Sequence, residues 1–147
     1  MRRWMLLLSL LVAGMQVPAG ATQPAAPQRV LFVGNSLTYV GNLPATFAAL
    51  ANANDQRVHS AMIVQGGATL EQRVADGSVR QALASYRPAV LVLVLGGGEL
   101  LCGAGEAACQ ASRQAVQALA AAGRQSGARV LLLGSYQAHP RASAAIV

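Results

Sequence analysis

The sequence predicts an α/β protein in which one parallel sheet lies between two layers of helices. Short apolar runs alternate with longer stretches of helical periodicity along the 147-residue chain. The run at 89–95 is apolar throughout, as expected of a parallel strand that helices cover on both faces. Regular alternation with short connections implies parallel pairing through right-handed crossovers.

Local signals justify the elements in order. Each strand is an apolar run that stops at glycine or polar turn residues. Pro44 suits the first turn of a helix, and Pro88 stops the helix that begins after Asp76-Gly77. The helix at 109–125 is the clearest, because a polar stripe lies opposite an apolar one. The expected elements are strand 29–33, helix 44–53, strand 57–64, helix 78–85, strand 89–95, loop 96–108, helix 109–125, strand 128–134 and the beginning of a helix at 140–147.

The first 21 residues are typical of an export signal. Two arginines precede an apolar stretch at 4–17, and Ala19-Gly20-Ala21 is a small-x-small cleavage site. The stretch is shorter than the roughly 20 residues of a spanning helix, which favours cleavage over a membrane anchor. Residues 22–28 would be a flexible leader and 29–147 a single domain. We expect a bacterial periplasmic or secreted protein with no stable membrane anchor after cleavage.

The basic charge indicates no particular partner. The formal net charge is +6, and every basic residue other than histidine is arginine. These arginines are scattered singly and have few aromatic neighbours, so they form no stacking platform for nucleic acid. We therefore expect no nucleic-acid partner.

The two cysteines, Cys102 and Cys109, fit an exported protein, in which they are kept oxidised. A disulfide between them would stabilise the fold by about 2.5 kcal/mol in the loop-entropy model. Two free thiols are the second interpretation. A metal site ranks third, because His59 and His139 lie far off in sequence and no residues have ligand spacing.

A serine follows the first predicted strand closely. The strand stops at Gly34 and presents Ser36 two positions on, at the edge of the sheet where open α/β folds place their chemistry. A nucleophilic serine needs that exposure, together with backbone N–H groups that face the developing oxyanion. A short Gly-x-Ser on its own is more typical of an ordinary surface serine than of a nucleophile.

A longer match favours the nucleophile. The segment Gly34-Asn35-Ser36-Leu37-Thr38 resembles the first block of the SGNH (GDSL-type) hydrolases, in the branch with Asn in place of the Asp of Gly-Asp-Ser-Leu. The segment Gly66-Gly67-Ala68-Thr69-Leu70 resembles the glycine block of that family. The resemblance runs from about residue 29 to the chain end. It implies a three-layer, flavodoxin-like α/β/α fold of SGNH type, with strand order 2-1-3-4-5 but without the last strand and helix.

The resemblance also implies roles. Ser36 would be the nucleophile, and the backbone N–H groups of Ser36 and Gly67 would bind the oxyanion. Asn35, Thr69 and Gly98 would lie around the substrate, and a cap of the turn is the alternative role for Asn35. Related enzymes place a side-chain amide where Gly98 stands, and loss of one oxyanion donor costs about 10²–10³ in rate.

The general base is the point at which this sequence differs most from the pattern of the family. The Asp-x-x-His block of the family, which follows a fifth strand, has no counterpart in this sequence. His139 would stand on the catalytic edge after the fourth strand, but residue 136 is Tyr and supplies no carboxylate. An ordinary loop histidine is therefore favoured over a base at His139, and His59 within the second strand is expected to face a neighbour or solvent.

The leading hypothesis is an exported serine ester hydrolase that acts on a small-molecule ester or acylated substrate through an acyl-enzyme. The resemblance implies no metal and no organic cofactor. We expect this chain to be weakly active or inactive, because an unactivated serine is a weak nucleophile. One alternative is a non-catalytic ligand-binding domain, which the missing amide at Gly98 favours. Another is a nucleotide or phosphate binder that uses residues 34–38 as an anion loop, although no P-loop Lys is present. Without a fifth strand, residues 129–133 would form a bare apolar edge and favour self-association.

Overall fold

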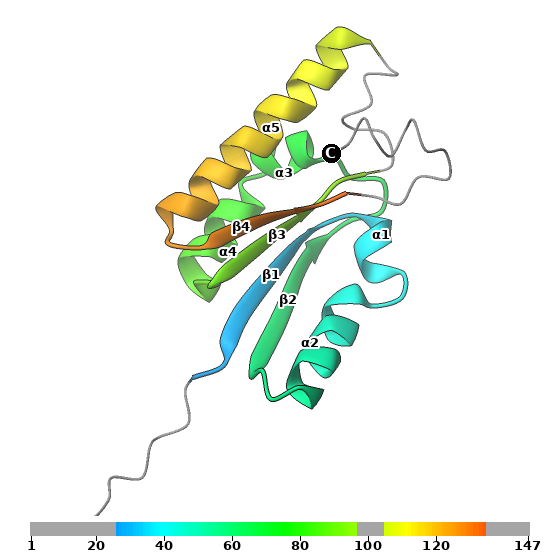
Figure 1. Ribbon diagram of the computed structural model, residues 1–147. Helices are drawn as coiled ribbons and strands as arrows, with labels where there is room; N and C mark the ends of the chain where they lie inside the picture. Colours follow the sequence, from blue (N-terminus) through cyan, green and yellow to red (C-terminus); the bar gives the residue numbers. More distant parts are fainter. Residues whose placement is uncertain (1–25, 97–104, 135–147) are drawn as a thin grey trace, which may run out of the picture.

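The computed structural model describes residues 26–96 and 105–134, and its centre is a parallel sheet with the strand order β2-β1-β3-β4 (Figure 1). The predicted α/β class and the order of these strands are confirmed. The strands are β1 (Gln28–Gly34), β2 (Val58–Val64), β3 (Val90–Val94) and β4 (Arg129–Leu133). The helices are α1 (Ser36–Tyr39), α2 (Leu43–Ala53), α3 (Leu70–Ala75), α4 (Ser78–Tyr86) and α5 (Glu106–Gln125).

Helices lie on both faces of the sheet, with α2 on one side and α3, α4 and α5 on the other (Figure 1). Successive side chains of a strand point to opposite faces. In β1, Leu31 and Val33 therefore pack toward α3–α5, whereas Val30 and Phe32 pack toward α2. The central strands are buried on both faces, which explains why their sequences are continuously apolar.

Strand register sets the position of the loops that follow the strands. Gly34 at the end of β1 lies opposite Val64 at the end of β2. On the other side of β1, Val33 lies opposite Leu93 of β3. The segments that leave these three strands therefore start at one edge of the sheet.

The differences from the predicted elements are local. Helices α1 and α3 were not predicted, and α5 begins at Glu106, inside the predicted loop at 96–108, rather than at Cys109. Strand β1 begins at Gln28, which was assigned to the leader. The predicted leader up to residue 25, the export signal and the helix at 140–147 lie outside the described residues.

Strand β4 has an apolar outer edge. Within the described sheet it pairs with β3 alone, and Leu131, Leu132 and Leu133 are 39%, 54% and 40% exposed. Only Val130 of β4 packs against the core beneath α5. In the described part of the chain, no helix is both long and apolar enough to cross a membrane.

Candidate active site

The turn that carries Ser36 is held by its neighbour Asn35. Strand β1 ends at Gly34, and α1 begins at Ser36. Asn35 caps this helix in an extended conformation, and its Oδ1 accepts the N–H of Leu37 at 3.0 Å. Ser36 is half-buried, and within the described residues neither its N–H nor its hydroxyl makes a hydrogen bond. The described part of the chain therefore leaves both groups available to a ligand.

Gly34 is needed for close packing. A Cβ at this position would lie against Thr38 Oγ1 and 2.9 Å from the Cβ of Val94 in β3. Thr38 is completely buried, and its hydroxyl has no hydrogen-bond partner in the described structure. The absence of a side chain at Gly34 therefore allows α1 to sit directly on the ends of β1 and β3.

The loop after β2 presents the second predicted oxyanion donor. Gly67 has a φ of 69°, in the left-handed region that glycine adopts without strain. The turn is closed by the N–H of Ala68, which donates to the carbonyl of Gln65 at 3.2 Å. The N–H of Gly67 itself has no acceptor among the residues described. An N–H that is left unpaired in the loop after a parallel strand is what an oxyanion site requires.

Ser36 and Gly67 line the same cavity, which has a volume of about 400 Å³. Such a volume suits a small-molecule ligand. The lining residues come from the segments that follow three neighbouring strands: Asn35, Ser36, Leu37, Gly67, Ala68, Thr69 and Gly96. The structure thus brings together Ser36, Gly67, Asn35 and Thr69, whose roles stay predictions. Gly98 lies outside the described residues.

Both predicted polar neighbours are engaged in hydrogen bonds within the protein. Thr69 caps α3: its Oγ1 accepts the N–H of Gln72, while Gln72 Oε1 accepts the N–H of Thr69 at 3.1 Å. The amide nitrogen of Asn35 donates to the carbonyl of Ala68 at 3.4 Å. The link between Asn35 and the glycine loop was not foreseen from the sequence.

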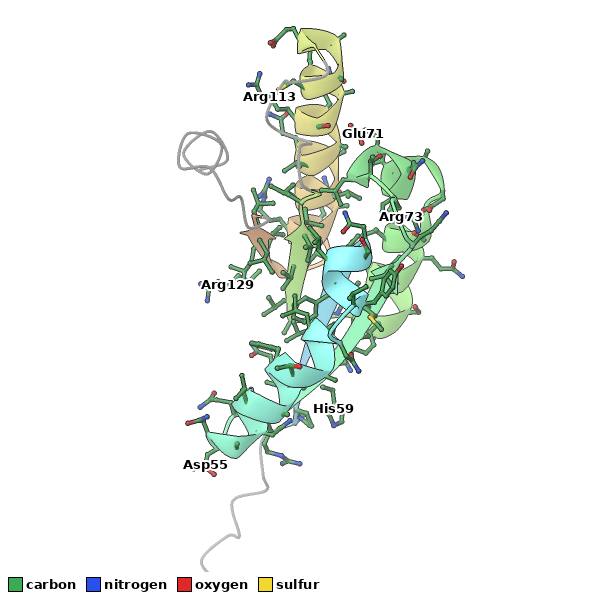
Figure 2. All side chains as sticks on the ribbon, turned by 90° about the vertical axis from the view of Figure 1, so that its right-hand side faces the viewer. Asp55, His59, Glu71, Arg73, Arg113 and Arg129 are labelled. Carbon is green, nitrogen blue, oxygen red and sulfur yellow. The ribbon has the colours of Figure 1, made fainter. Side chains whose placement is uncertain are left out.

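The described lining of this cavity contains no ionisable side chain. His59 is exposed and lies near the start of β2, opposite Arg29, whereas Ser36 follows the far end of β1. Five residues of strand separate the two levels, a distance of about 16 Å. Figure 2 shows His59 toward the end of the molecule that holds Asp55. His59 is therefore remote from Ser36, and His139 lies outside the described residues.

Glu71 connects the cavity wall to α5. Ser112 Oγ donates to Glu71 Oε1 at 2.6 Å. Partial burial pushes the pKa of Glu71 upward, but hydrogen bonds from Ser112, Thr69 and its own backbone outweigh burial and leave the pKa below its ordinary value. Glu71 is therefore an ionised tie between α3 and α5. This contact spans 41 positions of sequence, and no local pattern indicated it.

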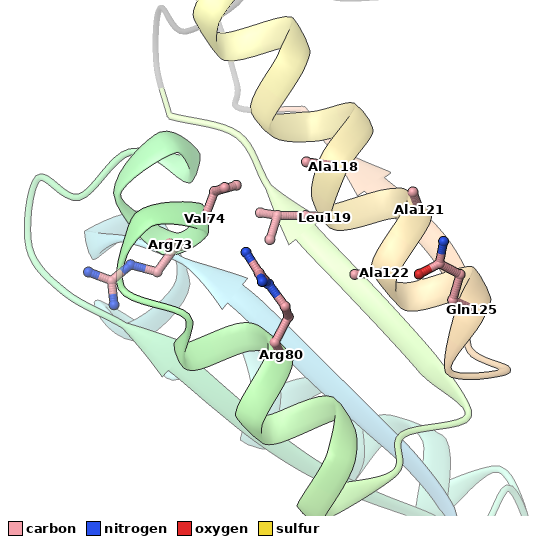
Figure 3. Close-up of a pocket in the computed structure, with 8 residues that line it drawn as sticks. All are labelled: Arg73, Val74, Arg80, Ala118, Leu119, Ala121, Ala122 and Gln125. Atoms are coloured by element: carbon pink, nitrogen blue, oxygen red, sulfur yellow. The ribbon is translucent and has the colours of Figure 1, made fainter.

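A second cavity, of about 290 Å³, lies between α3, α4 and α5 (Figure 3). Its lining is mainly Ala, Val and Leu, with Arg80 directed toward Leu119. Arg73 also borders it, but its guanidinium points away from α5 and binds Gln65 at 2.8 Å and Asp76 at 3.1 Å. Arg73 thus supports the loop after β2, and this cavity contains no nucleophile.

Cys109 is buried in the first turn of α5 and is not a free thiol. Its predicted partner, Cys102, lies outside the described residues. The pairing of these two cysteines therefore stays a prediction.

The parallel sheet with helices on both faces is a three-layer α/β fold, and Ser36 and Gly67 line one cavity at the edge of that sheet. No protein-family model matches the chain, and no curated protein does. Solved structures do match, and they are SGNH (GDSL-type) hydrolases. The chain has the fold of these enzymes over the part that it shares with them.

Three of the similar structures are TesA, the esterase EstA and a GDSL-like lipase. The chain is 27% identical to TesA, with a TM-score of 0.64 over 81% of this chain and 68% of TesA. It is 18% identical to the psychrotrophic esterase EstA from Pseudoalteromonas, whose structure is that of the enzyme inhibited by monoethylphosphonate. The TM-score with EstA is 0.56 over 81% of this chain and 67% of EstA. It is 19% identical to a GDSL-like lipase from Bacteroides thetaiotaomicron, with a TM-score of 0.51 over 71% of this chain and 47% of the lipase. The chain thus spans about two thirds of TesA and EstA and about half of the lipase.

Proposed function

We propose that this protein is an exported ester hydrolase of SGNH type in which Ser36 forms the acyl-enzyme. The observation that carries the proposal is the cavity that Ser36 and Gly67 share, where neither backbone N–H has an acceptor among the described residues. The similarity to esterase and lipase structures supports the same reaction class.

The proposed chemistry follows from these groups. Ser36 Oγ attacks the ester carbonyl, and the tetrahedral oxyanion accepts hydrogen bonds from the N–H groups of Ser36 and Gly67. The alcohol leaves, and water then releases the acid from the acyl-enzyme. The described lining is uncharged and includes the apolar side chains of Leu37 and Ala68. This lining suits a small ester with a neutral acyl group.

The proposed reaction requires a group that removes the proton from the Ser36 hydroxyl. None of the described cavity residues is a base, and an unactivated serine hydroxyl is a poor nucleophile. We therefore propose that the chain turns esters over slowly at best. The same observation favours a second candidate function, a non-catalytic domain that binds an ester or acylated ligand in the same cavity.

Hydrolysis of p-nitrophenyl acetate separates the two functions. Ser36→Ala should abolish the turnover that exceeds the background. Ser85→Ala is a matched control, because Ser85 is exposed on α4 and its hydroxyl donates to the carbonyl of Gln81. Equal rates for the Ser36→Ala variant and the unmodified chain would end the nucleophile assignment. Saturable binding of the ester without turnover would favour the binding domain.

Covalent trapping tests the nucleophile directly. A p-nitrophenyl ethylphosphonate should form a bond between Ser36 Oγ and phosphorus while p-nitrophenolate leaves and the serine proton passes to water. Mass spectrometry should place the adduct on Ser36 alone. Export is tested separately: after expression with the full signal, the periplasmic protein should begin at Thr22, and retention of the intact N-terminus in the cytoplasm would contradict export.

A further inference from the structure

We propose that Asn35 is a positioning residue that sets the distance between the two oxyanion donors. This inference rests on the proposed function. Asn35 is only 7% exposed, and both ends of its side-chain amide are used. Its oxygen accepts the N–H of Leu37 at 3.0 Å, and its nitrogen donates to the carbonyl of Ala68 at 3.4 Å.

These two bonds hold the residues next to the donors. Leu37 directly follows Ser36, and Ala68 directly follows Gly67. A carboxamide is planar and rigid, so two hydrogen bonds from its opposite ends fix the gap between the segments that they hold. The orientation of the amide is determined, because only its oxygen matches the N–H of Leu37 and only its nitrogen matches the carbonyl of Ala68.

Strand pairing alone leaves this gap loosely defined. The ladder between β1 and β2 ends at Gly34 and Val64, before either donor is reached. Beyond it, Gly66 and Gly67 are exposed and glycine-flexible. The hydrogen bond from the Asn35 side chain to the Ala68 carbonyl links the serine turn to this loop.

An Asn35→Asp substitution separates capping from bridging. Aspartate caps a helix as well as asparagine does, so the bond to Leu37 is retained. An ionised carboxylate has no proton to donate to the Ala68 carbonyl, and the two oxygens repel each other. Asn35→Ala removes both bonds. Asn54→Asp is the matched control, since it makes the same charge change at the exposed C-terminal end of α2.

The experiment has two readouts on the full chain. Hydrogen exchange by mass spectrometry, on a peptide that covers residues 65–69, should be faster in Asn35→Asp, while the peptides of β3 and α2 stay unchanged. The rate of phosphonylation of Ser36 should fall by up to about 10²-fold, the cost of a misplacement of about 1 Å, whereas complete loss of one donor costs about 10²–10³. The urea midpoint should fall, because the ionised carboxylate is buried against the Ala68 carbonyl, whereas unchanged exchange in β3 and α2 shows that the fold is retained. Asn54→Asp should leave the exchange of the 65–69 peptide and the phosphonylation rate unchanged.

The outcomes are distinct. Faster exchange confined to residues 65–69, together with slower phosphonylation, supports the positioning role. Unchanged exchange, or faster exchange with an unchanged phosphonylation rate, overturns it. If the unmodified chain is not labelled on Ser36, the proposed function fails, and the positioning role fails with it even where the exchange result shows that the bridge exists.

Discussion

Replacement of Gly34 by alanine should destabilise the protein through packing at the base of the serine turn. The new Cβ would meet Thr38 Oγ1 and would lie 2.9 Å from the Cβ of Val94. Thr38 is completely buried and Val94 nearly so, and the backbone of β3 fixes the Cβ of Val94. Neither neighbour is a flexible side chain that moves aside cheaply.

The magnitude follows from two opposing effects. Overpacking of a close-packed core costs about 1–3 kcal/mol, and two close contacts place this site toward the upper end. Alanine also lowers the conformational entropy of the unfolded chain, which stabilises the folded state by about 0.4–1 kcal/mol. We therefore expect a net loss of about 2 kcal/mol in the free energy of unfolding for Gly34→Ala.

Urea unfolding followed by far-ultraviolet circular dichroism measures this loss. Thr38→Ala removes one of the two contacts, so the double variant should lose about 1 kcal/mol less than the sum of the single changes. Gly67→Ala is an informative contrast. Its Cβ would meet nothing within 4 Å, but its φ of 69° disfavours alanine, so its cost should be independent of Thr38.

A Gly34→Ala variant as stable as the unmodified chain would refute the close approach of α1 to the strand ends. Strict additivity with Thr38→Ala would refute the role of Thr38 in that contact. A shift in the m-value instead of the midpoint would indicate a changed unfolded state.

Three further predictions concern the supports of the fold. Asn52→Ala should lower the free energy of unfolding by about 1–2 kcal/mol, because this side chain bonds the N–H and the carbonyl of Val58 at 3.0 and 3.1 Å; an unchanged urea midpoint would contradict this. The lowered pKa of Glu71 stabilises the fold above the ordinary carboxyl pKa, and this gain is lost as the pH falls through the folded pKa. Ser112→Ala should flatten that decline, as urea midpoints at neutral and acidic pH would reveal; an equal slope in both proteins would argue against the hydrogen bond. Leu132→Lys should reduce self-association in sedimentation velocity while unfolding changes by less than about 0.5 kcal/mol, since this side chain is 54% exposed on the sheet edge.

The strands and long helices were predictable because their signals are local. Continuous apolar runs marked the strands, and the polar stripe of α5 marked most of that helix. Helix α1 has only four residues, too few for a periodic signal. Helix α3 did have a signal, since Thr69 and Gln72 form a capping box that stands in the sequence as Thr-x-x-Gln.

The candidate site was predictable only in outline. Ser36 and Gly67 each follow a strand, and parallel neighbours bring their carboxyl ends to one edge. The bridge from Asn35 to Ala68 joins residues 33 positions apart and depends on the register of two strands. The sequence motif includes Gly34 but does not show why glycine is needed there. The reason is the close approach of Thr38 and Val94, which occurs only in the folded chain.

The central place of β1 in the sheet has a consequence for folding. Val30 pairs with Ser60 on one side and with Val90 on the other, so the second contact closes a loop twice as long. Each doubling of the loop length adds about 0.6 kcal/mol to the entropic free-energy cost of closing the loop. During synthesis, the serine turn emerges early, yet Val94 joins it only after β3 has left the ribosome. In the nascent chain, the edge of β1 that later pairs with β3 is therefore unpaired for some time. The docking of β3 then pairs this edge and completes the cavity wall.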